Sequence, residues 1–134
     1  MKTSVLTFYS TSQIKQLSEK GVIIPDSETV RITSDVFADN ISTGCTLHPF
    51  SRISGSETQI KTGAQIGVSG AATLENSWVG ENAQIGTLGP VTLKKTVVGP
   101  NSILGSGVAE QAVFLGKESM CNDFSTGYGF RVRK

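Results

Sequence analysis

Residues 41–59 read ISTGCTLHPFSRISGSETQ, residues 60–78 read IKTGAQIGVSGAATLENSW, and residues 79–97 read VGENAQIGTLGPVTLKKTV. Written one beneath another, these rows of 19 share a pattern, and a shorter row follows from Val98. Each row opens with an aliphatic residue, has a small residue four positions later, and a second aliphatic residue two positions after that. These columns are Ile41, Ile60, Val79 and Val98; Cys45, Ala64, Ala83 and Ser102; and Leu47, Ile66, Ile85 and Leu104. Self-similarity at a fixed period is typical of solenoid proteins.

The spacing within a row predicts short strands rather than helices. Side chains alternate along a strand, so the aliphatic residue and the small residue four positions later point to the same side. Three short strands separated by sharp corners would form a triangular coil of roughly 18 residues, and coils stacked about 4.8 Å apart would pair their backbones. An amphipathic helix needs apolar residues at three- and four-residue spacing, which the rows do not show.

Several details of the repeat are expectations about register. We expect a third inward column of Ile53, Ala72 and Val91, and we expect the nineteenth residue of each row at a corner near Gln59, Trp78 and Val97. After the row of 17 residues from Val98, we expect the repeat to restart at Leu115, with Cys121 continuing the six-residue spacing. Glu110 would fall in the third column, but a buried carboxylate is costly, so we expect it to face solvent.

The segment before the repeat resembles a helical cap. In STSQIKQLSEKG, residues 10–21, Ser10 and Gln13 form a possible capping box, Ile14 and Leu17 share a face, and Gly21 can end the helix. We therefore expect a cap over residues 1–21 and a β-helix of about five coils over residues 22–134. The last segment, GYGFRVRK, alternates like a strand and has no obvious cap. We expect the β-helix to be truncated there; an end covered by another chain is the alternative.

Composition narrows the class of protein. The chain has 134 residues, a formal charge of +1, and no long apolar segment, so nucleic-acid binding and membrane spanning are not expected. Cys45 and Cys121 have neither metal-site spacing nor a disulfide framework, and no metal site is predicted. MKTSVLTFYS is a poor signal peptide, so a cytoplasmic location is the default expectation.

Four segments resemble one family. GVIIPDSETVRI at 21–32, PFSRI at 49–53, GAQIG at 63–67 and LENSWVGENAQIG at 74–86 resemble hexapeptide-repeat, left-handed β-helix proteins. More narrowly, they are similar to the β-helix portion of bacterial UDP-N-acetylglucosamine pyrophosphorylases and related nucleotidyltransferases. The resemblance implies an all-β, left-handed, single-stranded parallel β-helix. Crossover connections between parallel strands are right-handed in nearly all proteins. The left-handed winding of the solenoid is therefore implied by the resemblance alone.

The resemblance implies two functions. The first is a trimerising domain in sugar-nucleotide metabolism without the nucleotidyltransferase domain, whose Gly-rich, arginine-bearing loop has no counterpart here. The second is an acetyl-CoA-dependent acyltransferase that acts on an amino sugar. The related acetyltransferases use a histidine general base in a cleft between subunits, and the single histidine of this chain is His48. Whether the chain is an enzyme is left open.

Five residues are candidates for a functional site or a subunit contact. His48 should face outward and could act as a base near neutral pH, but a surface or subunit-contact role is favoured. Arg52 could contact a phosphate. Phe50, Trp78 and Val97 are expected near the subunit contacts of a cyclic homotrimer, and for Trp78 a protein contact is favoured over a ligand stack. The resemblance implies either a sugar nucleotide or an amino sugar as a ligand.

Overall fold

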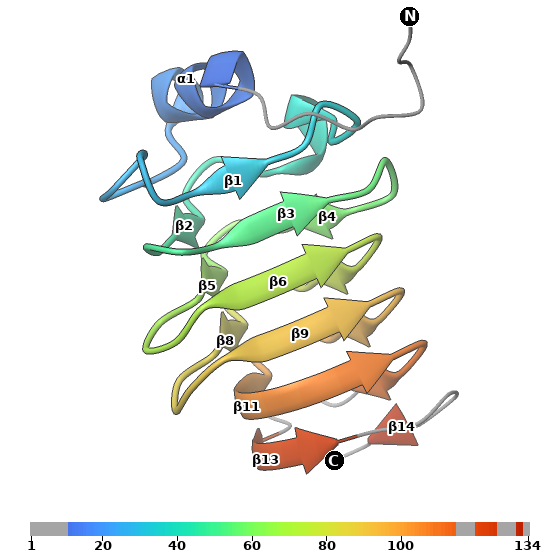
Figure 1. The fold of residues 1–134 in the computed structure, drawn as a ribbon. Coiled ribbons are helices and arrows are strands. Elements are labelled where there is room, and N and C mark those ends of the chain that lie inside the picture. Colours follow the sequence, from blue (N-terminus) through green and yellow to red (C-terminus); the bar gives the residue numbers. More distant parts are fainter. Residues whose placement is uncertain (1–10, 115–119, 126–130, 133–134) are drawn as a thin grey trace, which may run out of the picture.

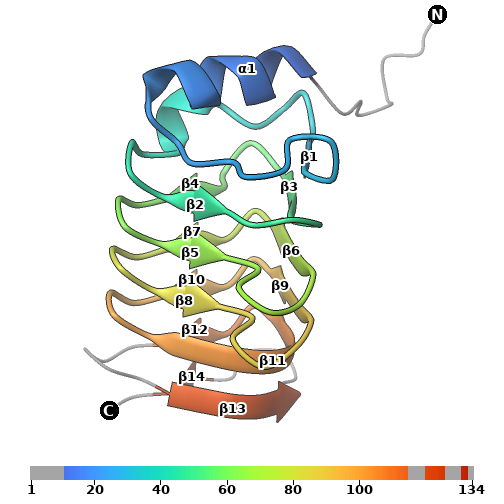
Figure 2. The same ribbon diagram turned by 90° about the vertical axis from the view of Figure 1, so that its left-hand side faces the viewer.

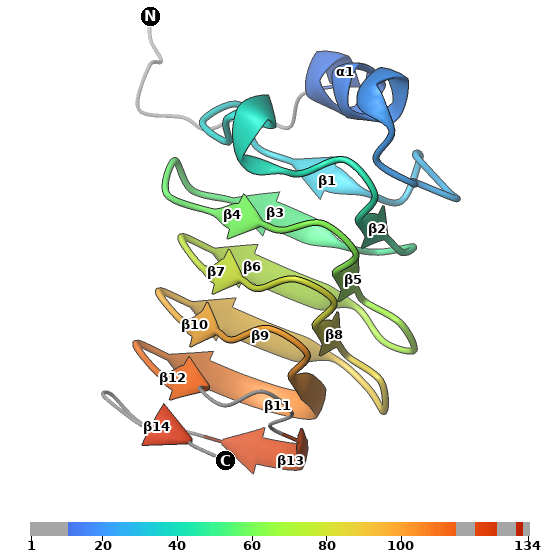
Figure 3. The ribbon, with the colours of Figure 1, turned by 180° about the vertical axis from the view of Figure 1, so that it is seen from behind.

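The computed structural model describes residues 11–114, 120–125 and 131–132, and its side chains from residue 13 to residue 114. Its strands are short and pair only in parallel, and they wind into a β-solenoid of about four turns. Figures 1 and 3 show the strands stacked as rungs, with a short helix across the amino-terminal end. The all-β parallel solenoid is confirmed; the left hand and the expected five coils stay predictions, as does the division at residue 21.

Three strand ladders form the walls, which we name faces A, B and C. Face A contains β2 (Thr46–Leu47), β5 (Gln65–Ile66), β8 (Gln84–Ile85), the start of β11 (Ile103–Glu110) and the start of β13 (Met120–Ser125). Face B contains β1 (Arg31–Ile32), β3 (Arg52–Ser54), β6 (Ala72–Glu75), β9 (Val91–Lys94) and the remainder of β11 and β13. Face C contains β4 (Gln59–Ile60), β7 (Trp78–Val79), β10 (Val97–Val98), β12 (Val113–Phe114) and β14 (Arg131–Val132).

The inward columns follow the sequence repeat. All twelve residues of the three columns in the 19-residue rows are fully buried. Ile60 pairs with Val79 and Val79 with Val98, while Ile66 pairs with Ile85. Aliphatic side chains in adjacent rungs therefore stack into continuous ladders, and their burial is the main stabilising contribution to the fold. Figure 2 shows the rungs from another side.

The additional column on face B, predicted as Ile53, Ala72 and Val91, was predicted in the wrong register. Ile53 pairs with Leu74, not Ala72, although Ala72 does pair with Val91. In the rung that contains Ile53, the corner between faces A and B is shorter than the same corner in the next rung. The corner that follows face B, after Ser54, is longer than its counterpart in the next rung. The two differences cancel, so the row length stays at 19 while the position of face B within the row changes.

Two further register predictions were wrong. Gln59, Trp78 and Val97 lie in the strands of face C and pair with one another, so they are not at a corner. The long corners are instead the segments 67–71 and 86–90, between faces A and B. The column of Val98 continues in Phe114 and not in Leu115. Since β11 runs from face A to face B without a corner segment, this rung contains fewer residues than the regular ones.

Two register predictions for β11 and β13 are confirmed. Cys121 is the register partner of Leu104, as predicted, although it follows Phe114 by seven residues and not by six. Glu110 is exposed and pairs with Lys94 on face B, so its carboxylate avoids the core.

The helix predicted within the cap forms as expected. Helix α1 (Thr11–Lys20) buries Leu17 completely and packs Ile14 against the core. Gly21 has a φ of +107°, its N–H donates to the Ser18 carbonyl, and the Val22 N–H donates to the Leu17 carbonyl. This is the Schellman pattern that a glycine at this position favours. Ser10 lies outside the described residues, so the capping box is not tested. Of the last segment, the described residues Arg131–Val132 form a strand as predicted, and residues 127–130 lie outside the described residues. A 3₁₀ turn, η1 (Ala38–Asn40), follows β1 beneath the helix.

Candidate functional site

His48 stands directly after β2, at the corner between faces A and B. Its backbone N–H donates to the Ile66 carbonyl at 2.9 Å, which continues the ladder. Its ring is half-buried, and Nε2 lies 3.1 Å from the amide oxygen of Gln65 on the next rung. Since an amide oxygen only accepts, Nε2–H is the donor in this contact. His48 thus faces outward as predicted, and Gln65 fixes the ring; its proposed role as a base stays a prediction.

Arg52 is exposed on face B, and Arg31 is its register partner on the neighbouring strand. Ile32 and Ile53, which follow the two arginines, are buried, so the arginine side chains project outward. The sequence analysis singled out Arg52 but not Arg31. Their 21-residue separation departs from the 19-residue period, and this hid the pair in the aligned rows.

The three predicted contact residues do not form one surface. Trp78 and Val97 are register partners on face C, whereas Phe50 lies at the corner between faces A and B. Phe50 is 60% exposed and Val97 is 37% exposed. Val113, which was not predicted, extends the ladder because it pairs with Val97 on the next rung.

Trp78 is held in place by its neighbours on face C. Its Nε1–H donates to the Gln59 amide oxygen at 3.2 Å, and the Lys61 Nζ lies 5.5 Å from the centre of its ring. A hydrogen bond on one edge and a cation over the ring restrict the rotamers of the indole. The side chain remains only partly buried, so its remaining surface is available for contact.

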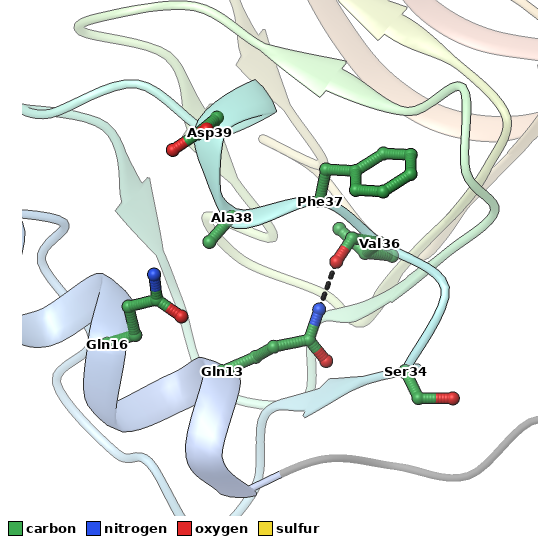
Figure 4. Close-up of a pocket in the computed structure, with 7 residues that line it drawn as sticks. All are labelled: Gln13, Gln16, Ser34, Val36, Phe37, Ala38 and Asp39. Atoms are coloured by element: carbon green, nitrogen blue, oxygen red, sulfur yellow. Dashed lines mark hydrogen bonds between the residues drawn. The ribbon is translucent and has the colours of Figure 1, made fainter.

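Surface pockets among the described residues include three at the amino-terminal end and at the corners of the rungs. The largest, of about 380 Å³, lies between α1 and the segment after β1 (Figure 4). Gln13 spans it and donates through its amide nitrogen to the Val36 carbonyl. Its lining is Gln13, Gln16, Ser34, Val36, Phe37, Ala38 and Asp39. With amides, one hydroxyl, one carboxylate and apolar groups, this pocket is the packing seam between the cap and the first rung.

The two smaller pockets lie at corners. One, of about 180 Å³, is lined by Pro49, Phe50 and the corner segment 67–71. The other, of about 280 Å³, is lined by Thr33, Asp35, Ser54, Gly55, Glu75 and Asn76. None of the three pockets includes His48. Over the described part of the chain, no three potential metal-ligating side chains of His, Cys, Asp or Glu gather in one place.

Cys45 is a core residue. Burial raises the pKa of its thiol from the usual 9.0 to about 11, against smaller opposing effects of a backbone hydrogen bond and Lys20. Its Sγ donates to the Ser42 carbonyl at 3.1 Å. A thiol that stays protonated is a poor nucleophile, which agrees with the structural role predicted for it.

Comparisons with known proteins leave the family unassigned. No protein-family model matches the chain, and no curated protein matches it either. The parallel solenoid is consistent with a hexapeptide-repeat β-helix. Within residues 11–114, 120–125 and 131–132, no helix has the length and apolar character that a bilayer crossing requires.

Proposed function

We propose that this chain is a self-associating β-solenoid domain that forms a homotrimer through the outer surface of face C. The observation that carries the proposal is the apolar ladder of Trp78, Val97 and Val113 on that face. Over the regular rungs, the other two faces are polar: Gln65 and Gln84 stand on face A, and Thr73 and Thr92 on face B. Over those rungs, face C carries the outward apolar surface; in the rung of Val113, Val108 on face B is outward and exposed as well.

Face C has properties of a preorganised interface. Tryptophan is enriched among residues that dominate binding energies, especially where it is packed in a fixed orientation. The contacts of Trp78 with Gln59 and Lys61 fix the indole before association. Binding then costs less side-chain entropy. A cyclic trimer allows each three-walled solenoid to place this wall against its neighbours.

The finer assignment rests on the sequence motifs alone. The resemblance at 21–32, 49–53, 63–67 and 74–86 supports a left-handed domain related to UDP-N-acetylglucosamine pyrophosphorylases, in cytoplasmic sugar-nucleotide metabolism. The alternative, an acetyl-CoA-dependent acyltransferase with His48 as base, has the outward position of that histidine in its favour.

The test is the oligomeric state in solution. Multi-angle light scattering at micromolar concentration should give the mass of a trimer for the unaltered chain and that of a monomer for Val97→Glu. Val108→Glu is the matched control, because Val108 is an outward valine on face B and 53% exposed. A monomeric unaltered chain would contradict the proposal, as would equal dissociation by both variants.

A further inference from the structure

Two arginines lie side by side near the amino-terminal end of face B. Arg31 of β1 and Arg52 of β3 are Cα partners on neighbouring parallel strands, and both side chains are exposed. Neighbouring strands are about 4.8 Å apart, so the two cationic side chains leave the sheet close together. Like charges in directly opposed positions destabilise a sheet. An anion held between the two guanidinium groups would remove that repulsion.

Within the described side chains, no carboxylate forms an ion pair with either arginine. Arg31 donates through Nη1 to the backbone carbonyl of Glu28. Two carboxylates of the adjoining corners have backbone partners: Asp26 accepts from the Glu28 N–H, and Asp35 accepts from the Gly55 N–H. The pair therefore retains donors for an external anion.

An exposed aromatic residue, Phe50, lies close in the chain to Arg52 and is hydrogen-bonded to the segment before Arg31. Phe50 precedes Arg52 by two residues, and its backbone N–H donates at 3.1 Å to the hydroxyl of Thr29, two residues before Arg31. Phe50 has a φ of +67°, a conformation that is uncommon for bulky residues. The other described non-glycine residues with positive φ are polar: Asn76, Asn82, Lys95, Asn101 and Gln111. Strain of this kind at an exposed aromatic residue points to a functional role.

Phe50 also borders a space for part of a ligand. Phe50 lines the pocket of about 180 Å³ formed with the corner segment 67–71. Gly67 and Gly70 contribute backbone to that lining, so a ligand could approach the main chain closely. This part of the surface therefore carries two guanidinium groups, an exposed aromatic residue and a small pocket.

We propose that Arg31, Arg52 and Phe50 bind a nucleoside phosphate. The guanidinium groups hold the phosphoryl oxygens, because their planar arrays of N–H donors match phosphate geometry. The base stacks on the Phe50 ring, an interaction available to every base. The site is on face B and its adjoining corner, so it goes beyond the assembly proposed for face C and does not depend on it.

Isothermal titration calorimetry of the full chain at low salt tests this site, with ADP and inorganic pyrophosphate as the two probes. ADP should bind more tightly than pyrophosphate, because only ADP carries a base. Arg31→Gln and Arg52→Gln should each weaken both ligands by about tenfold or more, since each removes charge-assisted hydrogen bonds. Phe50→Asn should abolish only the preference for ADP, because asparagine tolerates the left-handed backbone.

Lys94→Gln is the matched control for net charge. Lys94 is an exposed cation on the same face, but its register partners are Glu75 and Glu110. Its replacement should change binding less than twofold. Arg52→Lys keeps the positive charge but removes the planar guanidinium, so it should also weaken binding. A thermal unfolding temperature equal to that of the unaltered chain would show that this variant is folded.

Three results would overturn the proposal. The first is that the unaltered chain binds neither probe saturably. The second is that Lys94→Gln weakens binding as much as Arg52→Gln does. The third is that a folded Val97→Glu chain no longer binds ADP. A chain that proves monomeric yet binds ADP would contradict the trimer and leave this site intact.

Discussion

The regular rungs and the rung that begins with β11 differ at one corner. In the regular rungs, the segments 67–71 and 86–90 leave the ladder between faces A and B. In β11, the chain passes from face A to face B within one strand, and the separation between register partners falls from the 19 residues of Ala72 and Val91 to the 16 of Val91 and Gly107. The buried columns and the pairing are nevertheless kept. Corner length is therefore variable, whereas the pairs Leu93–Ala109 and Val98–Phe114 stay buried in the core.

The largest expected effect is in the regular stack. Ile85 is fully buried and pairs with Ile66 on one side and with β11 on the other. Ile85→Ala should lower the free energy of unfolding by about 2–5 kcal/mol, because it leaves a cavity between two rungs. Leu88→Ala is the control: Leu88 lies in the adjacent corner, is 64% exposed, and should change stability by less than about 0.5 kcal/mol. Urea unfolding followed by circular dichroism measures both, and equal effects would contradict the assignment of core and corner.

The small column gives a pH-dependent effect. The Cys45 pKa is about 11 in the folded chain against a usual 9.0, so above pH 9 the unfolded chain loses this proton first. The unfolded state is thereby favoured, and stability should fall as pH rises from about 9 to 11, by at most about 3 kcal/mol. Cys45→Ala, which matches Ala64 and Ala83 in the same column, should remove this component. Urea unfolding across that pH range compares the two chains; identical pH profiles would contradict the prediction.

The corners of successive rungs should respond differently to the same change. A Cβ on Gly70 would lie 2.3 Å from the backbone carbon of Gly89 in the next corner, whereas a Cβ on Gly89 would lie 3.4 Å from the Ser106 side chain. Gly70→Ala should therefore destabilise the chain by about 1–3 kcal/mol through overpacking, and Gly89→Ala should be nearly neutral. Thermal unfolding of the two variants tests the comparison directly. A larger loss for Gly89→Ala would show that the corners do not stack in this way.

The smallest expected effect is at the start of the shortened rung. Ser102 occupies the column of Ala64 and Ala83, and its buried hydroxyl has no hydrogen-bond partner within the described structure. Ser102→Ala should raise the free energy of unfolding by about 1 kcal/mol, because it removes a desolvated polar group. Ala83→Ser is the reciprocal control in a regular rung and should be destabilising. Chemical denaturation resolves both signs, and a destabilised Ser102→Ala chain would contradict the assignment of that hydroxyl.

The sequence predicts the three columns that repeat through the four rows and fails where corner lengths vary. Ile60, Val79 and Val98 keep both spacing and residue type, so their stacking is readable from the rows. Ile53 was misaligned because two compensating corner changes leave the row length unaltered. The Arg31–Arg52 pair was missed for a related reason, since their separation is not the period of the repeat. Contacts such as His48 with Gln65 depend on rotamers, which spacing does not specify.

The central claim is that residues 19 positions apart are closer in space than residues much nearer in sequence. Spin labels on Gln65→Cys and Gln84→Cys, in a Cys45→Ala, Cys121→Ala background, would stand on adjacent rungs of face A, with backbones about 5 Å apart. Labels on Gln65→Cys and Glu75→Cys would stand on different faces, although they are closer in sequence. Continuous-wave electron paramagnetic resonance should show strong dipolar broadening for the first pair and much less for the second. The reverse order would contradict the solenoid.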